Sequence, residues 1–225
     1  MTRICVAVEG RTERAFISGV LAPLLGRRGV YITAHLIGTR GHQGGGVTIL
    51  RLKKDVLRFL LQDKESACST MFDYYGLASD FPGKDRIAAN QSTSMKAEII
   101  ETALRGEIER EMGSSFDSRR FIPYVQMHEF EGLLFSDPVS LAASLRNPGS
   151  EEQFRDIRRA FGSPEDINDE YETCPSRRIM NIHPRYDKPT GGVIAAHAIG
   201  LEKMRAECPH FSAWVAKLES LGDKA

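Results

Sequence analysis

Carboxylate side chains follow three apolar segments of the sequence, at the point where each segment ends. Glu9 comes directly after the first, Asp73 closes the second, and the third runs into His128-Glu-Phe-Glu131. Each segment has the length of a strand, and parallel strands bring their carboxyl ends to one edge of a sheet. We therefore expect these acids, which are distant in sequence, to converge.

Carboxylate oxygens with little nitrogen or sulfur nearby suit Mg²⁺ or Mn²⁺ better than zinc. Such cations neutralise the charge that develops on a phosphate group and orient a water or a leaving oxygen. The acids therefore predict metal-dependent chemistry on phosphate esters.

Each of these residues also has an ordinary structural explanation. Glu13 lies in the first turn of a predicted helix, where the helix dipole favours a negative charge. Asp73 could cap the loop that follows it, and His128 could be a hydrogen-bonded, partly buried imidazole. Glu129 and Glu131 share a face if the strand continues through them, but only one of them reaches the site if a helix starts at Glu129.

Several familiar motifs are excluded. No second histidine follows His128 at position 132, so the helix motif of zinc proteases is absent. In the glycine-rich loop 38–46, Val47 stands where a phosphate-binding loop requires lysine, and the glycine spacing does not fit a dinucleotide site. This loop is predicted to be either a connection or a lid near the sheet edge.

Strand-like and helix-like segments alternate through the first 137 residues, which predicts an α/β fold. A mostly parallel four-stranded sheet flanked by helices is the expected architecture. The predicted strands are 3–8, 31–37, 68–73 and 121–127, and the predicted helices are 12–25, 47–61 and 94–112.

No strand-like segment follows residue 137, where proline-containing turns separate short helical segments. Residues 1–137 are therefore predicted to form the α/β core, and residues 138–225 a helical subdomain.

The composition bears on nucleic-acid binding, membrane association and the state of the cysteines. Thirty basic and 30 acidic residues cancel, so any nucleic-acid binding must come from a local patch. No apolar run is long enough to span a bilayer, and the N-terminus does not resemble a signal peptide, so we expect a cytoplasmic protein with no membrane partner. The four scattered cysteines are expected to be reduced.

Basic residues concentrate in one part of the second half. Arg177, Arg178, Arg185 and Lys188 are accompanied there by a glycine pair that follows the lysine. Such residues could clamp a nucleic-acid backbone, although from the residues alone ordinary surface charge is the favoured explanation.

Sequence motifs along nearly the whole chain resemble the DUF4276 family, whose core is similar to the Toprim (topoisomerase-primase) fold. The motifs are Val8-Glu-Gly-Arg-Thr-Glu13, Thr70-Met-Phe-Asp-Tyr-Tyr-Gly-Leu77, Asp80-Phe-Pro-Gly83, Pro123 to Asp137, Pro175-Ser-Arg-Arg178, Tyr186-x-Lys188 and Cys208-Pro-His-Phe-x-x-Trp214.

This resemblance implies a Toprim-like nuclease site that holds Mg²⁺ or Mn²⁺. Glu9 would be a general acid or base or a metal-contacting carboxylate, Asp73 a metal ligand, and Glu129 or Glu131 a further acid. The candidate catalytic set is Glu9, Glu13, Asp73, His128, Glu129 and Glu131, of which Glu9, Asp73 and Glu129 are the candidate metal ligands.

The resemblance also implies partners. Related systems pair a Toprim effector, toxic to the cell, with an ATPase of the ABC/SMC-like type in antiphage defence, and RNA, including tRNA, or DNA would be the substrate. The sequence leaves the oligomeric state, including a homodimer, open.

One position departs from the generic Toprim pattern of Asp-x-Asp after the third strand. Tyr75 stands where the second aspartate is expected, so Asp80 or an acid within residues 128–131 must replace it, or metal binding is weaker. Two hypotheses follow: a metal-dependent endonuclease, or a non-catalytic Toprim-like module that binds nucleic acid or an ATPase partner.

Overall fold

The computed structural model of the protein describes residues 1–38, 47–168 and 171–222. Most of the glycine-rich loop, predicted to be a connection or a lid, lies outside these residues. Parallel strands form the centre of the fold in the order β2-β1-β3-β4, with β5 paired to β3. The strands are β1 (Thr2–Val8), β2 (Val30–Leu36), β3 (Ala67–Asp73), β4 (Phe121–Ile122) and β5 (Val125–Gln126).

The predicted fourth strand, 121–127, is broken into two pieces, so the sheet has five strands and not four. Pro123 lies at the break and has no N–H to give to a ladder. The side chain of Thr70 replaces the missing backbone contacts, since its Oγ1 donates to the Tyr124 carbonyl and accepts from the Tyr124 N–H, both at 2.8 Å. Pairing then resumes between β5 and the end of β3.

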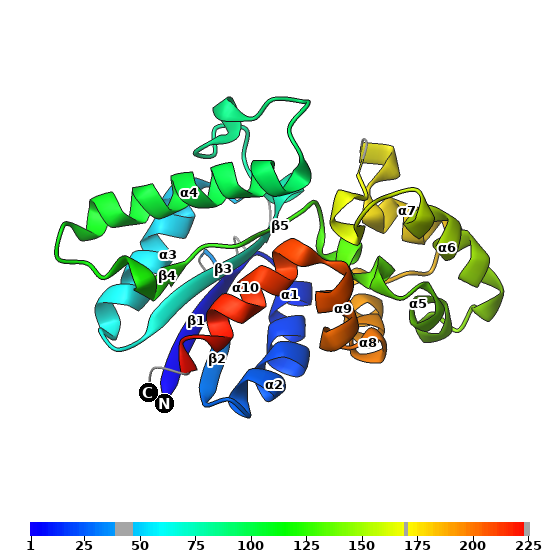
Figure 1. Ribbon diagram of the computed structural model, residues 1–225, viewed down its shortest axis with the longest axis horizontal. Helices are drawn as coiled ribbons and strands as arrows, with labels where there is room; N and C mark the ends of the chain where they lie inside the picture. The colour runs from blue at the N-terminus through cyan, green and yellow to red at the C-terminus, as the bar shows by residue number, and fades with distance from the viewer. Residues whose placement is uncertain (39–46, 169–170, 223–225) are drawn as a thin grey trace.

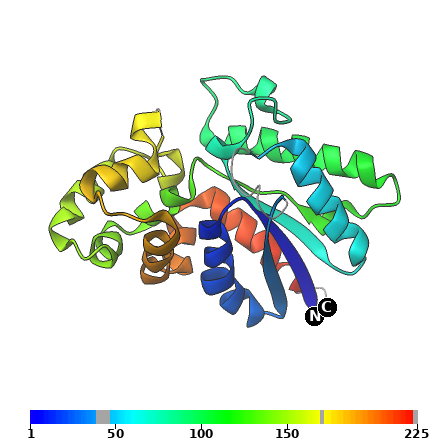
Figure 2. The same cartoon turned by 180° about the vertical axis from the view of Figure 1, so that it is seen from behind.

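Helices cover both faces of the sheet (Figures 1 and 2). Val6 and Val8 of β1 belong to the core shared with α1 (Arg11–Phe16), α2 (Ala22–Gly26) and α10 (Pro209–Glu219). Ala7 belongs to the core shared with α3 (Ile49–Gln62) and α4 (Thr93–Met112). This alternation follows from the two-residue period of a strand. The helices in this layer are α1 (Arg11–Phe16), continued by a π-helical turn (Ile17–Leu21) and α2 (Ala22–Gly26), then α3 (Ile49–Gln62) and α4 (Thr93–Met112).

The predicted α/β class, with a mostly parallel sheet flanked by helices, is therefore confirmed. Among the described residues after Gln126, every regular element is helical. The elements that bear on the site are the 3-10 helix η5 (Phe130–Ser136), α5 (Pro138–Ser144), α6 (Glu151–Arg159), α7 (Pro175–Ile182), α8 (Lys188–Ile199), α9 (Leu201–Glu207) and α10 (Pro209–Glu219).

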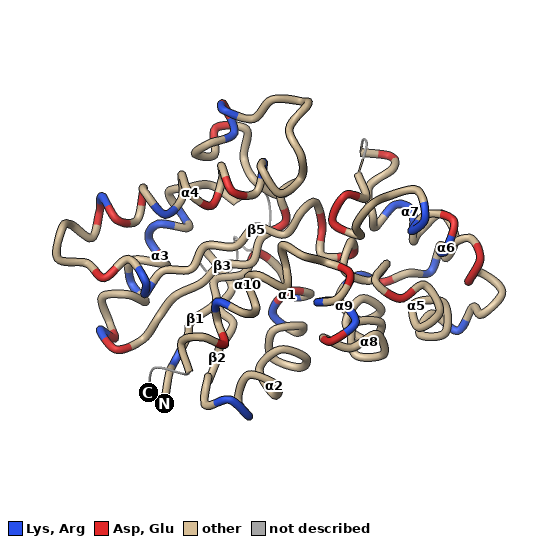
Figure 3. The backbone as a smooth tube through the Cα atoms, viewed as in Figure 1, with Lys and Arg blue, Asp and Glu red and all other residues tan. Residues whose placement is uncertain are grey.

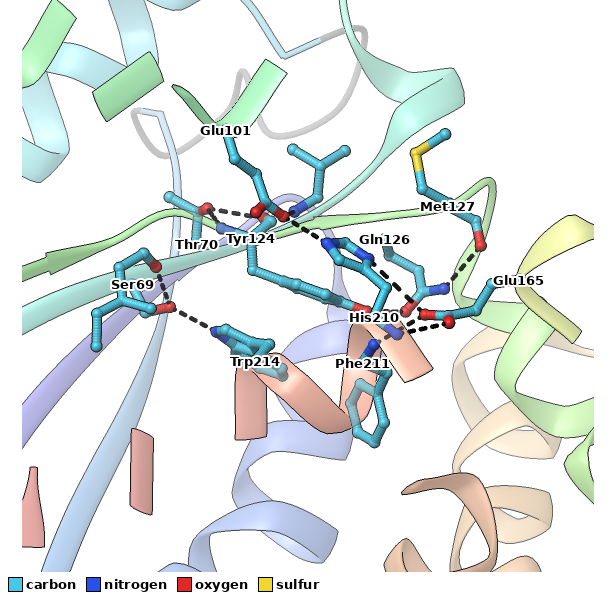
Figure 4. A network of polar contacts seen from close by, with 12 residues as sticks. Ser69, Thr70, Glu101, Tyr124, Gln126, Met127, Glu165, His210, Phe211 and Trp214 are labelled. Atoms are coloured by element: carbon cyan, nitrogen blue, oxygen red, sulfur yellow. Dashed lines mark hydrogen bonds and ion pairs between the residues drawn. The ribbon is translucent and has the colours of Figure 1, made fainter. Parts of the chain in front are cut away.

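The last helix packs directly on the sheet (Figure 4). The Trp214 indole N–H donates to Ser69 Oγ of β3 at 2.9 Å, and the indole ring stacks on Tyr124 with 4.3 Å between ring centres. Beside it, His210 Nε2 lies 2.8 Å from Glu101 Oε1 of α4. A polar and aromatic network thus joins α10 to the sheet and to α4. The division of the chain at residue 137 stays a prediction.

The remaining expectations concern the cysteines and the membrane. All four cysteines are free thiols, as predicted. None of the helices within the described ranges combines the length and the apolar character needed to cross a bilayer.

Candidate functional site

A cavity of about 480 Å³ opens at the carboxyl edge of β1 and β3, where the predicted acids were expected to meet. Four of the six candidate catalytic residues line it, and they come from three separate parts of the chain. Its polar lining comprises Glu9, Arg11, Thr12, Glu13, Asp73, Tyr75 and Glu129.

The turn after β1 places the first two acids. Gly10 is the extended residue that precedes α1, so Glu9 leaves the strand end and Glu13 lies in the first helical turn. Gly76 makes room for Glu9, because a Cβ atom at that position would lie 2.3 Å from Glu9 Oε2. A side chain at position 76 would therefore displace the Glu9 carboxylate.

The end of β3 is tied to the segment that carries the third acid. Asp73 Oδ1 accepts a hydrogen bond of 2.8 Å from the backbone N–H of Phe130, the first residue of η5. Glu129 precedes this helix in an extended conformation, with φ −136° and ψ 156°. Asp73 thereby fixes the position of Glu129 in the cavity wall.

Both carboxylate oxygens of Glu129 accept hydrogen bonds from residues of α7 and α8. Oε2 accepts from the Ser176 backbone N–H at 2.9 Å, and Oε1 accepts from the Ser176 hydroxyl at 3.1 Å and from Lys188 Nζ at 3.2 Å. Ser176 lies in the first turn of α7, where the helix dipole also favours an anion.

Glu131 lies behind this wall and is only 1% exposed. Its Oε1 accepts from the Tyr186 hydroxyl at 3.2 Å, and its Oε2 lies 3.6 Å from Lys188 Nζ. Neither arrangement considered from the sequence is realised, because the strand ends at Gln126 and the helix begins only at Phe130. As a result Glu129 faces the cavity and Glu131 is internal, yet both contact Lys188.

Burial and mutual repulsion make most of these carboxyls reluctant to ionise. Burial, followed by the charges of Glu13, Glu131 and Glu129, raises the pKa of Asp73 well above its ordinary value. Burial also raises the pKa of Glu9 and of Glu13, and it raises the pKa of Glu131 to about 7.

Glu129 is the exception. Burial alone would raise its pKa, but Lys188 and the hydrogen bonds from Ser176 outweigh that effect and lower the pKa below its ordinary value. Lys188 in turn has a raised pKa, since the neighbouring carboxylates outweigh its own desolvation. Glu129 and Lys188 therefore form an ion pair at neutral pH.

The donor chemistry of the cavity suits a hard divalent cation, whose charge would relieve the repulsion that raises these pKa values. The side chains are not preassembled, however. Within the part of the chain that the structure describes, no three His, Cys, Asp or Glu side chains form a ready metal-binding group. Glu9, Asp73 and Glu129 could hold a cation only after their side chains turn toward a common point.

His128 and Asp80, which the sequence also suggested for the site, lie outside the acidic cavity. His128 is buried, with its ring centre 5.6 Å from that of Tyr74 and 6.1 Å from that of Tyr75. Asp80 is exposed on the loop after β3. Neither is among the described residues that line the cavity, so a catalytic role for His128 stays a prediction.

The predicted basic residues do not act as one group. Arg177 donates to the Tyr171 hydroxyl at 2.6 Å, while Arg178 donates to the Thr173 carbonyl at 2.5 Å and lies over the Phe161 ring. Arg185 is exposed and Lys188 is engaged with the acids. Elsewhere, for instance along α4 and α6, basic and acidic positions are interleaved (Figure 3).

Residues that support the acids were not singled out from the sequence. Ser176 and Tyr186 bind Glu129 and Glu131, and Gly76 makes space for Glu9. Ser176 and Tyr186 lie inside the motifs Pro175 to Arg178 and Tyr186-x-Lys188. Only the basic residues of these motifs were predicted to belong to a site.

Comparison with known proteins agrees with this assignment of motifs. The family model described as "Domain of unknown function (DUF4276)" matches residues 8–219. The chain belongs to the DUF4276 family. The matched residues of this DUF4276 chain include every acid that lines the cavity.

Two further comparisons add little about this member of DUF4276. No curated protein matches the chain. One solved structure that it resembles is the C-terminal region of the OLD protein of Xanthomonas campestris pv. campestris, with 13% identity, 99% of this chain and 97% of that chain covered, and a TM-score of 0.43.

Proposed function

We propose that this protein is a metal-dependent endonuclease that cleaves nucleic-acid phosphodiesters in the acidic cavity. The observation that carries the proposal is the convergence of Glu9, Glu13, Asp73 and Glu129 on one open cavity at the carboxyl edge of the sheet. Ligands of open α/β folds bind at this edge, and oxygen donors are those that Mg²⁺ and Mn²⁺ prefer.

In this proposal Glu9 and Asp73 hold the cation and Glu129 is its third contact. The cation would supply charge neutralisation on the phosphate and a favourable orientation for the attacking water. Glu13, in the first turn of α1, adds further negative charge to the cavity. Burial raises the pKa of Glu9, which would also suit it to act as a general acid or base.

Lys188 has two roles in this scheme. It neutralises Glu129 and Glu131 when no substrate is present, and its side chain is 42% exposed, so it can also turn toward a phosphate. Arg177 and Arg185 are the further candidates for contacts with the phosphate backbone. The proposed setting, a toxic defence effector controlled by an ABC/SMC-like ATPase, rests on the family resemblance alone.

The test incubates the purified protein with tRNA, single-stranded DNA and duplex DNA in the presence of Mg²⁺ or Mn²⁺. We expect cleavage by the wild type and its loss in Glu9→Ala and in Asp73→Ala, with Asp80→Ala as the exposed matched control. Cleavage that survives both substitutions would contradict the assignment of the site. A parallel reaction with the partner ATPase guards against an effector that is held inactive.

A second candidate function is a non-catalytic module that binds nucleic acid or an ATPase. Tyr75 favours it, because this residue lines the cavity where the generic Toprim pattern has a second aspartate. The candidate predicts binding without cleavage under every metal condition. Cleavage gained only in Tyr75→Asp would support the binding module over the endonuclease.

A further inference from the structure

A second cavity, of about 490 Å³, adjoins the acidic cavity. The two share Tyr75 and Glu129 as common wall residues. Residues of α7 and the segment before it complete the second cavity, and α7 packs against η5, which follows Glu129. A ligand that spans both cavities would therefore pass directly over the Glu129 carboxylate.

The chemistry of the second cavity differs from that of the first. Tyr171 and Tyr75 present aromatic rings that are 65% and 39% exposed, and Met180 and Cys174 add apolar surface. Arg177 orients the more exposed ring, since its guanidinium carbon lies 4.9 Å from the Tyr171 ring centre and its Nη2 donates to the Tyr171 hydroxyl at 2.6 Å. The cavity is thus lined by aromatic and apolar groups together with two cations, Arg177 and Lys188, and the Glu129 carboxylate.

We infer that the second cavity receives an unpaired base of a single-stranded nucleic acid, next to the phosphodiester in the acidic cavity. Planar bases stack on aromatic side chains and on guanidinium groups, and such stacking tolerates any base. The volume lies within the range of pockets that bind small planar ligands. This inference rests on the proposed function, because it supplies the neighbouring part of the same substrate.

The cavity would make the protein selective for strands whose bases are free. A base in a duplex is already stacked and paired, and taking it out costs free energy that an unpaired base does not. Lys188 and Arg177 also line this cavity and can meet the phosphates on either side of the base. Single-stranded segments, loops and ends of RNA or DNA are the substrates that fit.

Binding in EDTA separates this inference from cleavage. The probes are short fluorescein-labelled single strands of RNA and DNA, the same strand with an abasic site, and a duplex of the same sequence, all measured by fluorescence anisotropy with the full chain. We expect the wild type to prefer the single strands, and Tyr171→Ala to weaken their binding by about 5- to 150-fold. Tyr171→Phe retains the ring and should retain most of the affinity.

Tyr31→Ala is the matched control, because Tyr31 is 49% exposed at the amino end of β2, away from both cavities. Equal affinity of Tyr171→Ala and the wild type, or duplex binding as tight as single-strand binding, would overturn the inference. If binding follows the expected pattern but no variant cleaves, the base site stands and the endonuclease proposal fails. If cleavage occurs without dependence on Tyr171, the reverse holds.

Discussion

Lys188 Nζ donates a hydrogen bond of 3.2 Å to Oε1 of Glu129 across 59 positions of the chain. Lys188 is the first residue of α8, whereas Glu129 lies between the broken fourth strand and η5. The same ammonium lies 3.6 Å from Glu131. One cation at the start of α8 therefore balances two carboxylates that follow the last strand of the sheet.

Replacing Lys188 with methionine should destabilise the protein at neutral pH. The change leaves Glu129 and Glu131 without their counter-charge, and we expect the free energy of unfolding to fall by about 1–2 kcal/mol, less than for a fully buried pair because the side chain is 42% exposed. Urea unfolding at pH 7 and pH 5 measures the effect, which should shrink at the lower pH as Glu131 becomes neutral. Lys203→Met, which removes a surface pair with Glu207, is the control; a loss as large in that variant would show that position 188 is not special.

The free energy of unfolding should decrease as the pH rises from about 4.5 to 7. Glu131 has a pKa of about 7 when folded and an ordinary value of 4.5, so the folded protein binds more protons than the unfolded chain in this window. For a carboxyl as buried as this one, the shift corresponds to about 3 kcal/mol lost across the window. The raised pKa values of Asp73, Glu9 and Glu13 act in the same direction.

Urea unfolding at closely spaced pH values checks this dependence, with Glu131→Gln as the paired variant. Glutamine cannot ionise but can keep the contact with Tyr186, so its profile should be flatter over the same range. A wild-type profile that rises between pH 4.5 and 7, or one that Glu131→Gln leaves unchanged, would contradict the assignment. The lowered pKa of Glu129 has its effect only below pH 4.5, where stability falls with further acidification.

Gly76→Ala should impair the acidic cavity more than the fold. The added Cβ would lie 2.3 Å from Glu9 Oε2, so the carboxylate must move out of its position. We expect cation binding and any cleavage to fall while the melting temperature changes little. Gly106→Ala is the matched control, because nothing lies within 4 Å of its Cβ in α4 and alanine should add about 0.5–1 kcal/mol of stability. Intact cation affinity in Gly76→Ala would mean that Glu9 is not a ligand.

Binding of Mg²⁺ or Mn²⁺ should strengthen with pH and release protons. Cation binding requires ionised carboxylates, and burial raises the pKa of Glu9 and of Asp73 in the unliganded protein. Isothermal titration calorimetry in buffers of different ionisation enthalpy measures both quantities. Glu9→Gln and Asp73→Asn should each weaken affinity by about tenfold or more, whereas Asp80→Asn, an exposed acid outside the cavity, should not. Affinity independent of pH, or equal sensitivity to Asp80→Asn, would refute a cation site here.

Trp214→Ala should cost about 3–5 kcal/mol, because the indole is 2% exposed and its removal leaves a void and loses the hydrogen bond to Ser69 Oγ. Urea unfolding followed by far-ultraviolet circular dichroism should still give one transition, shifted to lower urea, since α10 and the sheet share a core. Trp214→Phe, which keeps an aromatic ring, should cost less. Two separated transitions would instead favour independent folding of the parts before and after residue 137.

The regular elements could be predicted from the sequence because their signals are local. Apolar alternation and helical period placed β1, β2, β3, α3 and α4 to within a few residues, and acids at strand ends pointed to one edge. The break at Pro123 was missed because the apolar run 121–127 hides a residue without an N–H. The compensating hydroxyl comes from Thr70, in a different strand.

The parts of the site that could not be predicted depend on contacts between distant residues. Whether Glu129 contacts Ser176, and whether Lys188 points at acids or at solvent, depends on how α7 and α8 pack against the rest of the chain. The local sequence indicated only that Lys188 was one of several neighbouring basic residues. The same limit applies to Gly76, whose closeness to Glu9 depends on how two strand ends meet.

The hydroxyl of Thr70 gives the broken edge of the sheet a fixed alignment. Because it bonds to both backbone polar groups of Tyr124, we expect it to hold the register of the chain after Pro123 along β3. Without these two hydrogen bonds, the pairing of Gln126 with Asp73 would be free to shift. A one-residue slip would turn every following side chain to the opposite face of the sheet. A single small side chain in the core thus helps to determine where Glu129 and Glu131 lie relative to the end of β3.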